Sequence, residues 1–183
     1  MSGALPVALL VAMAAGHTPT FVRRPRPLVS TPKPMASANF TLNVSPATIT
    51  FTTSNNPGTT PLVAGSAPAS VTWSAFSIFD NNNWTLTVQS NSPAFANCPQ
   101  VPISAVTVTC SAATVSGIGG SAACSAAFPL STAPQRVAGG VVGSLFSYNY
   151  SVTINFTLAD SWKYIAETNP ACSLSLTYTA NVP

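Results

Sequence analysis

The sequence of 183 residues contains very little charge, because its six Lys and Arg and three Asp and Glu amount to only 5% of the chain. Ordinary globular domains are about one quarter charged. Four of the basic residues (Arg23, Arg24, Arg26 and Lys33) precede position 39, which leaves two basic against three acidic side chains, a net charge of −1, for residues 39–183. This scarcity excludes a basic nucleic-acid surface on residues 39–183.

Histidine is also nearly missing, and its single copy, His17, lies near the N-terminus. Residues 39–183 therefore hold no Ser-His or Cys-His pair, and their carboxylates, Asp80, Asp160 and Glu167, are widely scattered. No catalytic, cofactor-binding or metal-ligating residue is predicted, and the protein is not expected to be an enzyme. A secreted hydrolase is the remote alternative, and it would need a cleft that holds one of the three carboxylates.

The chain lacks an apolar run long enough to span a bilayer as a stable helix, since "ALPVALLVAMAAG" covers only residues 4–16. Small residues at Ala12-Met13-Ala14 and at Ala36-Ser37-Ala38 offer two cleavage sites, with a Pro- and Arg-rich stretch between them. We therefore expect residues 1–38 to be a leader, removed or disordered, and residues 39–183 to form one extracellular or cell-surface domain without a transmembrane segment. The alternative is a disordered tail on a cytosolic protein.

What the sequence does have is strict alternation of apolar and polar residues. From Phe146 to Leu158 every even position is apolar and every odd position is Ser, Thr or Asn, and Cys172 to Val182 repeats the pattern. Side chains two residues apart share one face of a strand, so one face is buried and the other is wet. The first strand would be about 40 Å long, so we expect it to bend, carry a bulge or serve two sheets.

Shorter alternating runs separated by turn residues fill most of the region between positions 40 and 110. Alternation is typical of antiparallel sheets that face water on one side. The sequence therefore predicts an all-β fold, an antiparallel β-sandwich of about 7–9 strands, immunoglobulin-like or jelly-roll-like, with a barrel as the lesser alternative.

The four cysteines, Cys98, Cys110, Cys124 and Cys172, lie in a Ser- and Thr-rich region without histidine. This composition favours two disulfides in an oxidising compartment over a metal site, for which Cys-x-x-Cys or Cys-plus-His spacing is missing. Four cysteines allow three pairings. We favour Cys98 with Cys110, which closes a short loop, and Cys124 with Cys172.

The segment "FDNNNWTLTVQSNSPAF" resembles the first signature of the WxL family of bacterial cell-surface proteins, with Trp84-Thr85-Leu86 as its Trp-x-Leu. The second family signature corresponds to Leu176-Thr177-Tyr178, which lacks the tryptophan. The resemblance implies a secreted β-rich module held non-covalently at the bacterial wall, with Trp84 and Leu86 as a candidate surface motif. Alternatively, both residues are core positions of an ordinary strand.

These observations together lead to an expectation about function. Neutral, hydroxyl-rich β surfaces fit an exported, non-catalytic bacterial module with a structural or adhesive role, associated with the cell wall. Its expected partners are cell wall or surface glycan, or copies of itself, without nucleic acid and without a cofactor. The alternative is a subunit of an extracellular filament that exchanges its first strand, "NFTLNVS" at 39–45, between copies.

Overall fold

A computed structural model of the chain describes residues 41–54, 56–78, 82–143, 145–164 and 171–182. Within these residues the regular structure consists of eleven β-strands and one short 3-10 helix, η1 (Ile103–Ala105). All of them lie in the compact unit formed by Met35–Pro183. The expected leader, residues 1–38, lies outside the described residues.

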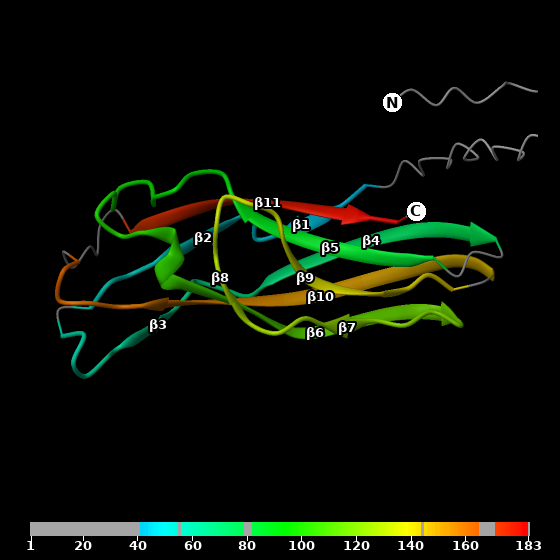
Figure 1. Cartoon of the computed structure of the whole chain (residues 1–183), viewed down its shortest axis with the longest axis horizontal. Helices are drawn as coiled ribbons and strands as arrows, with labels where there is room; N and C mark the ends of the chain where they lie inside the picture. Colours follow the sequence, from blue (N-terminus) through cyan, green and yellow to red (C-terminus); the bar gives the residue numbers. More distant parts are fainter. Residues whose placement is uncertain (1–40, 55, 79–81, 144, 165–170, 183) are drawn as a thin grey trace, which may run out of the picture. The chain divides into compact units, whose positions relative to one another are not determined.

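One sheet, sheet A, is built around the longest strand of the chain. Its order is β1-β4-β10-β6-β8, and β3 pairs with the end of β10 beside β4. The 15-residue β10 lies between β4 and β6, as Figure 1 shows. The strands of sheet A are β1 (Asn43–Ser45), β3 (Leu62–Ala64), β4 (Ala69–Ile78), β6 (Val106–Ile118), β8 (Phe128–Pro129) and β10 (Leu145–Ala159).

The second sheet, sheet B, has the order β2-β11-β5-β9-β7. Every strand pair in both sheets is antiparallel. The two sheets pack face to face as a sandwich, which confirms the predicted fold class. The strands of sheet B are β2 (Thr48–Phe51), β5 (Asn83–Ser90), β7 (Ala123–Cys124), β9 (Gln135–Val141) and β11 (Cys172–Asn181).

The strand order identifies the kind of sandwich. When the additional edge strands β1, β3 and β7 are left out, the sheets read β4-β10-β6-β8 and β2-β11-β5-β9. The chain passes repeatedly between the sheets, and its first strand in this set, β2, pairs with its last, β11. This is the order of a jelly roll, a double sheet of eight strands. Of the two predicted variants, the topology is the jelly-roll one.

The two long alternating segments form the strands that were predicted. Along β10 the even residues Val152, Ile154, Phe156 and Leu158 are buried, while the odd ones face outward. The ladder between β10 and β6 is irregular in two places. Between Leu145 and Asn149 the extra residues are on β10, whereas between Thr153 and Ile154 the extra residue, Ser111, is on β6. The irregularity expected in β10 is therefore the first of these, and β10 stays within one sheet.

Aromatic side chains fill the centre of the core between the sheets. Trp73 stacks on Tyr150 with ring centroids 4.9 Å apart, and Trp84 meets both rings edge-on at 5.4 and 5.2 Å. Trp73 and Tyr150 come from sheet A and Trp84 from sheet B, so the cluster joins the two layers. Such pairs contribute about 0.5–1.5 kcal/mol each beyond the burial of their area.

The N-terminal strand belongs to both sheets. Residues 43–45 pair with β4 in sheet A, whereas residues 48–51 pair with β11 in sheet B. Pro46, preceded by a cis peptide bond, lies where the chain passes from sheet A to sheet B. Sheet A and sheet B are therefore connected along one side by a continuous strand path.

Candidate functional site

All four cysteines form disulfides, as predicted, but the predicted pairing is wrong. Cys98 pairs with Cys172 and Cys110 with Cys124, with Cα–Cα distances of 5.3 and 5.4 Å. The second bridge joins β6 of sheet A to β7 of sheet B, so it links the two layers near one edge.

Backbone pairing between distant segments explains the Cys98–Cys172 bridge, and a local turn explains the Cys110–Cys124 bridge. The loop after β5 runs beside the start of β11, where the backbones of Ala96 and Ser173 exchange hydrogen bonds of 3.1 and 3.3 Å, and this brings Cys98 to Cys172. Gly117, with φ of 133°, begins the reversal that returns the chain beside β6. It lies midway between Cys110 and Cys124, which are 14 residues apart. This symmetric spacing about a glycine turn was a usable signal in the sequence.

The candidate surface motif is not at the surface. Trp84 and Leu86 are both 0% exposed and belong to the core. The indole Nε1 of Trp84 donates a hydrogen bond of 2.9 Å to the backbone carbonyl of Ser121, so the polar atom of the ring is also used internally. The alternative interpretation, core positions of a sandwich strand, is the one that the structure supports.

The outward face of sheet A carries a different candidate, a shallow depression of about 430 Å³. It spans β1, β4, β10 and β6, four strands that are distant in the sequence. The side chains that line it from the outward positions are amides and hydroxyls, and we call them the polar face. The polar face consists of Asn43, Thr72, Ser74, Thr114, Ser116, Asn149 and Ser151.

Hydrogen bonds across the strands orient several of these groups. The hydroxyl of Ser74 donates to Oδ1 of Asn149 at 2.6 Å. Thr114 and Ser116 on β6 direct their hydroxyls to the backbone carbonyls of Ser151 and Asn149 on β10, both at the long distance of 3.5 Å. The hydroxyl oxygens keep lone pairs for a ligand, and within the described residues the amide nitrogen of Asn149 has no protein partner.

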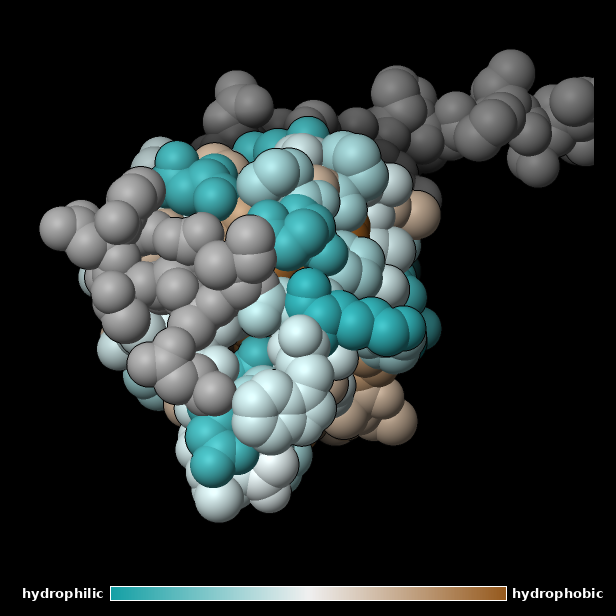
Figure 2. Space-filling view, turned by 90° about the vertical axis from the view of Figure 1, so that its left-hand side faces the viewer, coloured by the Kyte–Doolittle hydropathy of each residue, from teal (hydrophilic) through white to brown (hydrophobic). Residues whose placement is uncertain are grey.

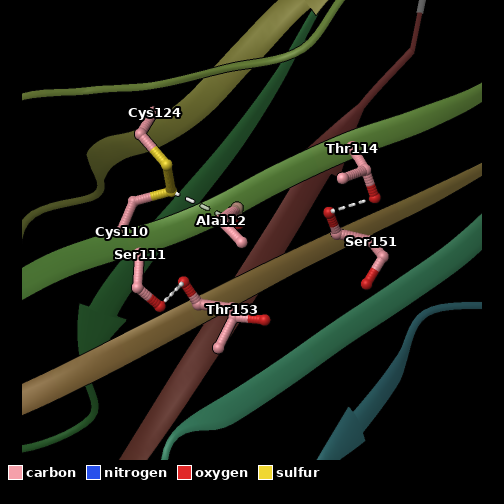
Figure 3. Close-up of a disulfide and its surroundings, with 7 residues drawn as sticks. All are labelled: Cys110, Ser111, Ala112, Thr114, Cys124, Ser151 and Thr153. Carbon is pink, nitrogen blue, oxygen red and sulfur yellow. Dashed lines mark hydrogen bonds between the residues drawn. A yellow bond between two sulfur atoms is a disulfide. The ribbon is translucent and has the colours of Figure 1, made fainter.

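Figure 3 shows the same pattern continuing beside the disulfide. Ser111 donates a hydrogen bond of 3.3 Å to the carbonyl of Thr153, which is two residues further along β10 than Ser151, the partner of Thr114. The 3.6 Å contact between Sγ of Cys110 and the carbonyl of Ala112 is not a hydrogen bond, because a disulfide sulfur carries no proton. The bridge runs from β6 to β7 of sheet B and is not part of the polar face.

One aromatic ring lies on the same side of the sheet. Phe76 occupies an outward position of β4, two residues beyond Ser74, and is 61% exposed. Among the described residues, no charged side chain lines the depression. The outward face of sheet A therefore offers hydrogen-bonding groups and an apolar ring. Figure 2 views another part of the surface, one end of the domain, where hydrophilic and intermediate side chains predominate and hydrophobic ones are scattered.

Of the carboxylates considered for hydrolysis, Asp80 and Glu167 lie outside the described residues. Asp160 accepts backbone hydrogen bonds from Ser54 at 2.7 Å and from Ser161 at 2.8 Å. Both of its oxygens are thus used to hold a turn. In the described part of the chain, no group of three or more His, Cys, Asp or Glu side chains gathers where it could hold a metal ion.

Two tyrosines that pack in or against the core have raised pKa values. Burial, with a smaller contribution from the neighbouring Tyr148, raises the pKa of Tyr150 to about 12. Burial raises the pKa of Tyr178 as well. Neither hydroxyl has a hydrogen-bond partner among the described residues. Both groups are neutral at physiological pH and supply no acid–base chemistry to the polar face.

Comparison of the chain with family models, with curated proteins and with solved structures finds no match. Over the described residues, no helix is both long and apolar enough to span a membrane. The fold and the composition of its faces are therefore the basis for a functional proposal.

Proposed function

We propose that the chain is an exported, non-catalytic bacterial surface module with a structural or adhesive role, and that its polar face binds a neutral glycan of the wall or cell surface. The observation that carries this proposal is the depression of about 430 Å³, in which the outward side chains are uncharged amides and hydroxyls. The size lies within the usual range of ligand sites. The two disulfides support an oxidising, extracellular environment.

The chemistry of the face fits a sugar better than other ligands. A neutral glycan presents many hydroxyl donors, and the oxygens of Thr114 and Ser116 are acceptors on the outward side. The Asn149 amide donates in return. An apolar sugar face can pack on the ring of Phe76, which is 61% exposed. Within the described part of the chain, the lining contains no Arg, Lys or His that could pair with a phosphate or carboxylate ligand.

Co-sedimentation of the protein with isolated wall material tests the proposal. The variant Ser116→Asp replaces the hydroxyl in the depression by a charged carboxylate. A bound glycan would have to displace the water that solvates this carboxylate, which costs free energy. We expect binding to fall at least about tenfold, which corresponds to about 1.4 kcal/mol.

The matched control is Ser175→Asp, the same change at an exposed position of β11 in sheet B. It should leave binding unchanged, and both variants should keep the melting temperature of the parent protein. Equal loss in both variants, or no sedimentation of the parent protein with any neutral glycan preparation, would refute the proposal.

A filament subunit is the second candidate, favoured by one observation. Among the residues that the structure describes, the outer side of β4 pairs with β1 only through Ser70, Val71 and Thr72, and no charged residue or proline lies on the rest of β4. Unguarded edges of this kind can accept a strand from another copy.

A further inference from the structure

Arg136, on β9, is an exposed cation without an acidic partner in the described part of the chain. Asp160 is the only acidic residue that the structure describes, and its two oxygens accept backbone hydrogen bonds from Ser54 and Ser161. Among the described residues, no hydrogen bond or ion pair engages the guanidinium of Arg136. Its five N–H donors and its charge are therefore available to an anion from outside the chain.

A β-bulge determines which way the side chain of Arg136 points. The ladder between β5 and β9 is irregular at Val137, which is an extra residue on β9. Val137 and Ala138 are both buried in the core, whereas Arg136 is exposed. In a regular strand, residues three apart lie on opposite faces of the sheet. The extra residue therefore puts Arg136 and Gly139 on the same, outward face of sheet B.

Gly139 provides the surface on which the guanidinium of Arg136 lies. A Cβ atom at Gly139 would clash with a terminal nitrogen of the guanidinium and would lie 2.8 Å from its Cζ and Nε atoms. The side chain of Arg136 therefore folds back along β9 and covers the backbone of Gly139, which is buried. Any residue other than glycine would take the space that the guanidinium occupies.

Two small residues on the neighbouring strands flank the guanidinium. Gly139 is opposite Thr85 on β5 and opposite Ala123 on β7. Thr85 alternates with the buried Trp84 and Leu86, so its side chain is on the outward face as well. Cβ positions directly opposite each other are about 4.5–5.5 Å apart, which places the hydroxyl of Thr85 beside the guanidinium. Within the described chain, that hydroxyl forms no hydrogen bond.

We propose that the guanidinium of Arg136 and the hydroxyl of Thr85 bind an oxyanion, the carboxylate or phosphate group of a ligand that approaches the outward face of sheet B. The parallel N–H donors of a guanidinium match two oxygens of such a group. The bulge and the space over Gly139 already hold the side chain in place, so binding costs less side-chain freedom than it does for an extended arginine. This inference concerns sheet B and does not depend on glycan binding at the polar face.

Titration of the full chain with inorganic phosphate and, separately, with acetate tests the site. The Nε–H signal of Arg136 in a nitrogen–proton correlation spectrum is the direct readout, at an ionic strength held constant with chloride. We expect a shift that saturates with at least one of the two anions, and the anion that saturates identifies the group that the site accepts. Shifts that grow linearly with both anions, as for unspecific screening, would overturn the proposal.

The variant Gly139→Ala separates the position of the arginine from its charge. It keeps Arg136 but places a methyl group where the guanidinium lies, and the φ angle of Gly139 is outside the left-handed region, so the backbone accepts alanine. We expect the dissociation constant for the saturating anion to rise at least about fivefold, as it should in Arg136→Gln. Lys163→Gln, which removes the other basic residue of the described chain, is the matched control and should leave binding unchanged. Equal binding by Gly139→Ala and the parent chain would overturn the assignment.

The variant Thr85→Val tests the hydroxyl at nearly constant side-chain volume. We expect the dissociation constant to rise at least about twofold, because one hydrogen bond to the anion is lost. Thr179→Val, the same change at an exposed position of β11, should leave binding unchanged. Both variants should keep the melting temperature of the parent chain, since each change lies at the surface. Equal loss in the two variants, or no loss in either, would contradict the role of Thr85.

Discussion

At the scale of single residues, the aromatic cluster of the core buries two polar atoms, the hydroxyl of Tyr150 and Nε1 of Trp73. Tyr150 is 1% exposed and its ring lies 4.9 Å from that of Trp73. Neither Trp73 Nε1 nor the Tyr150 hydroxyl has a hydrogen-bond partner among the described residues. Burial of an unpaired polar atom is costly, so stacking and apolar contacts must outweigh that cost at this position.

We predict that Tyr150→Phe reduces the loss of stability at high pH. Burial raises the pKa of Tyr150 from 10.0 to about 12, so the folded protein holds this proton more tightly than the unfolded chain. Its contribution is complete below pH 10 and is lost as the pH rises from 10 toward 12. The variant should lower the slope of unfolding free energy in this window by up to about 1.4 kcal/mol per pH unit.

Urea unfolding at pH 8, 10.5 and 11.5 measures this effect. At pH 8 the variant should differ from the parent by no more than about 1 kcal/mol, because the hydroxyl that it removes has no protein partner. Parallel stability curves for the two proteins across the three pH values would contradict the assignment of the shift to Tyr150.

At the scale of elements, the period of two predicted the long strands and missed the short ones. The alternation in β10 and β11 extends over ten residues or more, which is a strong signal. The strands β7 and β8 have two residues each, and β1 and β3 have three. Segments this short show no recognisable alternation of apolar and polar residues, and they are strands only because they pair with neighbouring strands. The predicted strand number was therefore too low.

The disulfide pairing shows the same limit. Cys98 and Cys172 are 74 residues apart and meet only because the loop after β5 lies beside β11. Composition predicted that both bridges exist, but contact between distant segments decides the partners. The Cys110–Cys124 pair was accessible from the sequence through the glycine turn between them.

We predict that the two bridges differ in their contribution to stability. In the chain-entropy model, a loop of 14 residues corresponds to about 3 kcal/mol and a loop of 74 residues to about 4.5 kcal/mol. The variant Cys98→Ala with Cys172→Ala should therefore melt lower than Cys110→Ala with Cys124→Ala. Both should lie roughly 10–20 °C below the parent, as calorimetry would measure.

Peptide mapping under non-reducing conditions is the control for this comparison. It should recover a peptide that joins Cys98 to Cys172 and another that joins Cys110 to Cys124. A peptide that joins Cys98 to Cys110 would contradict the structure and restore the pairing first expected from sequence.

At the scale of the whole molecule, the few charged residues lie away from the polar face. The charged residues within the described chain are Arg136, Asp160 and Lys163, and none of them lies on the strands that form the depression. Composition predicted a neutral, hydroxyl-rich surface. It did not predict which face carries the depression, because four strands converge there only after folding.

The resemblance around Trp84 illustrates the difference between a local pattern and a site. Alternation placed Trp84 and Leu86 on one face of a strand, and the structure shows that this face is the buried one. No signal within the tripeptide distinguishes the inward face from the outward face. The packing of β5 between β11 and β9, opposite sheet A, decides it.

Mapping of amide chemical shifts during titration with a neutral wall oligosaccharide tests the central claim most directly. The account predicts that the shifts concentrate at Ser74, Phe76, Ser116, Asn149 and Ser151, on the outward side of sheet A, and that they change little with salt because no ion pair is involved. Shifts confined to sheet B or the loops, or the absence of shifts with every neutral oligosaccharide at millimolar concentration, would contradict it.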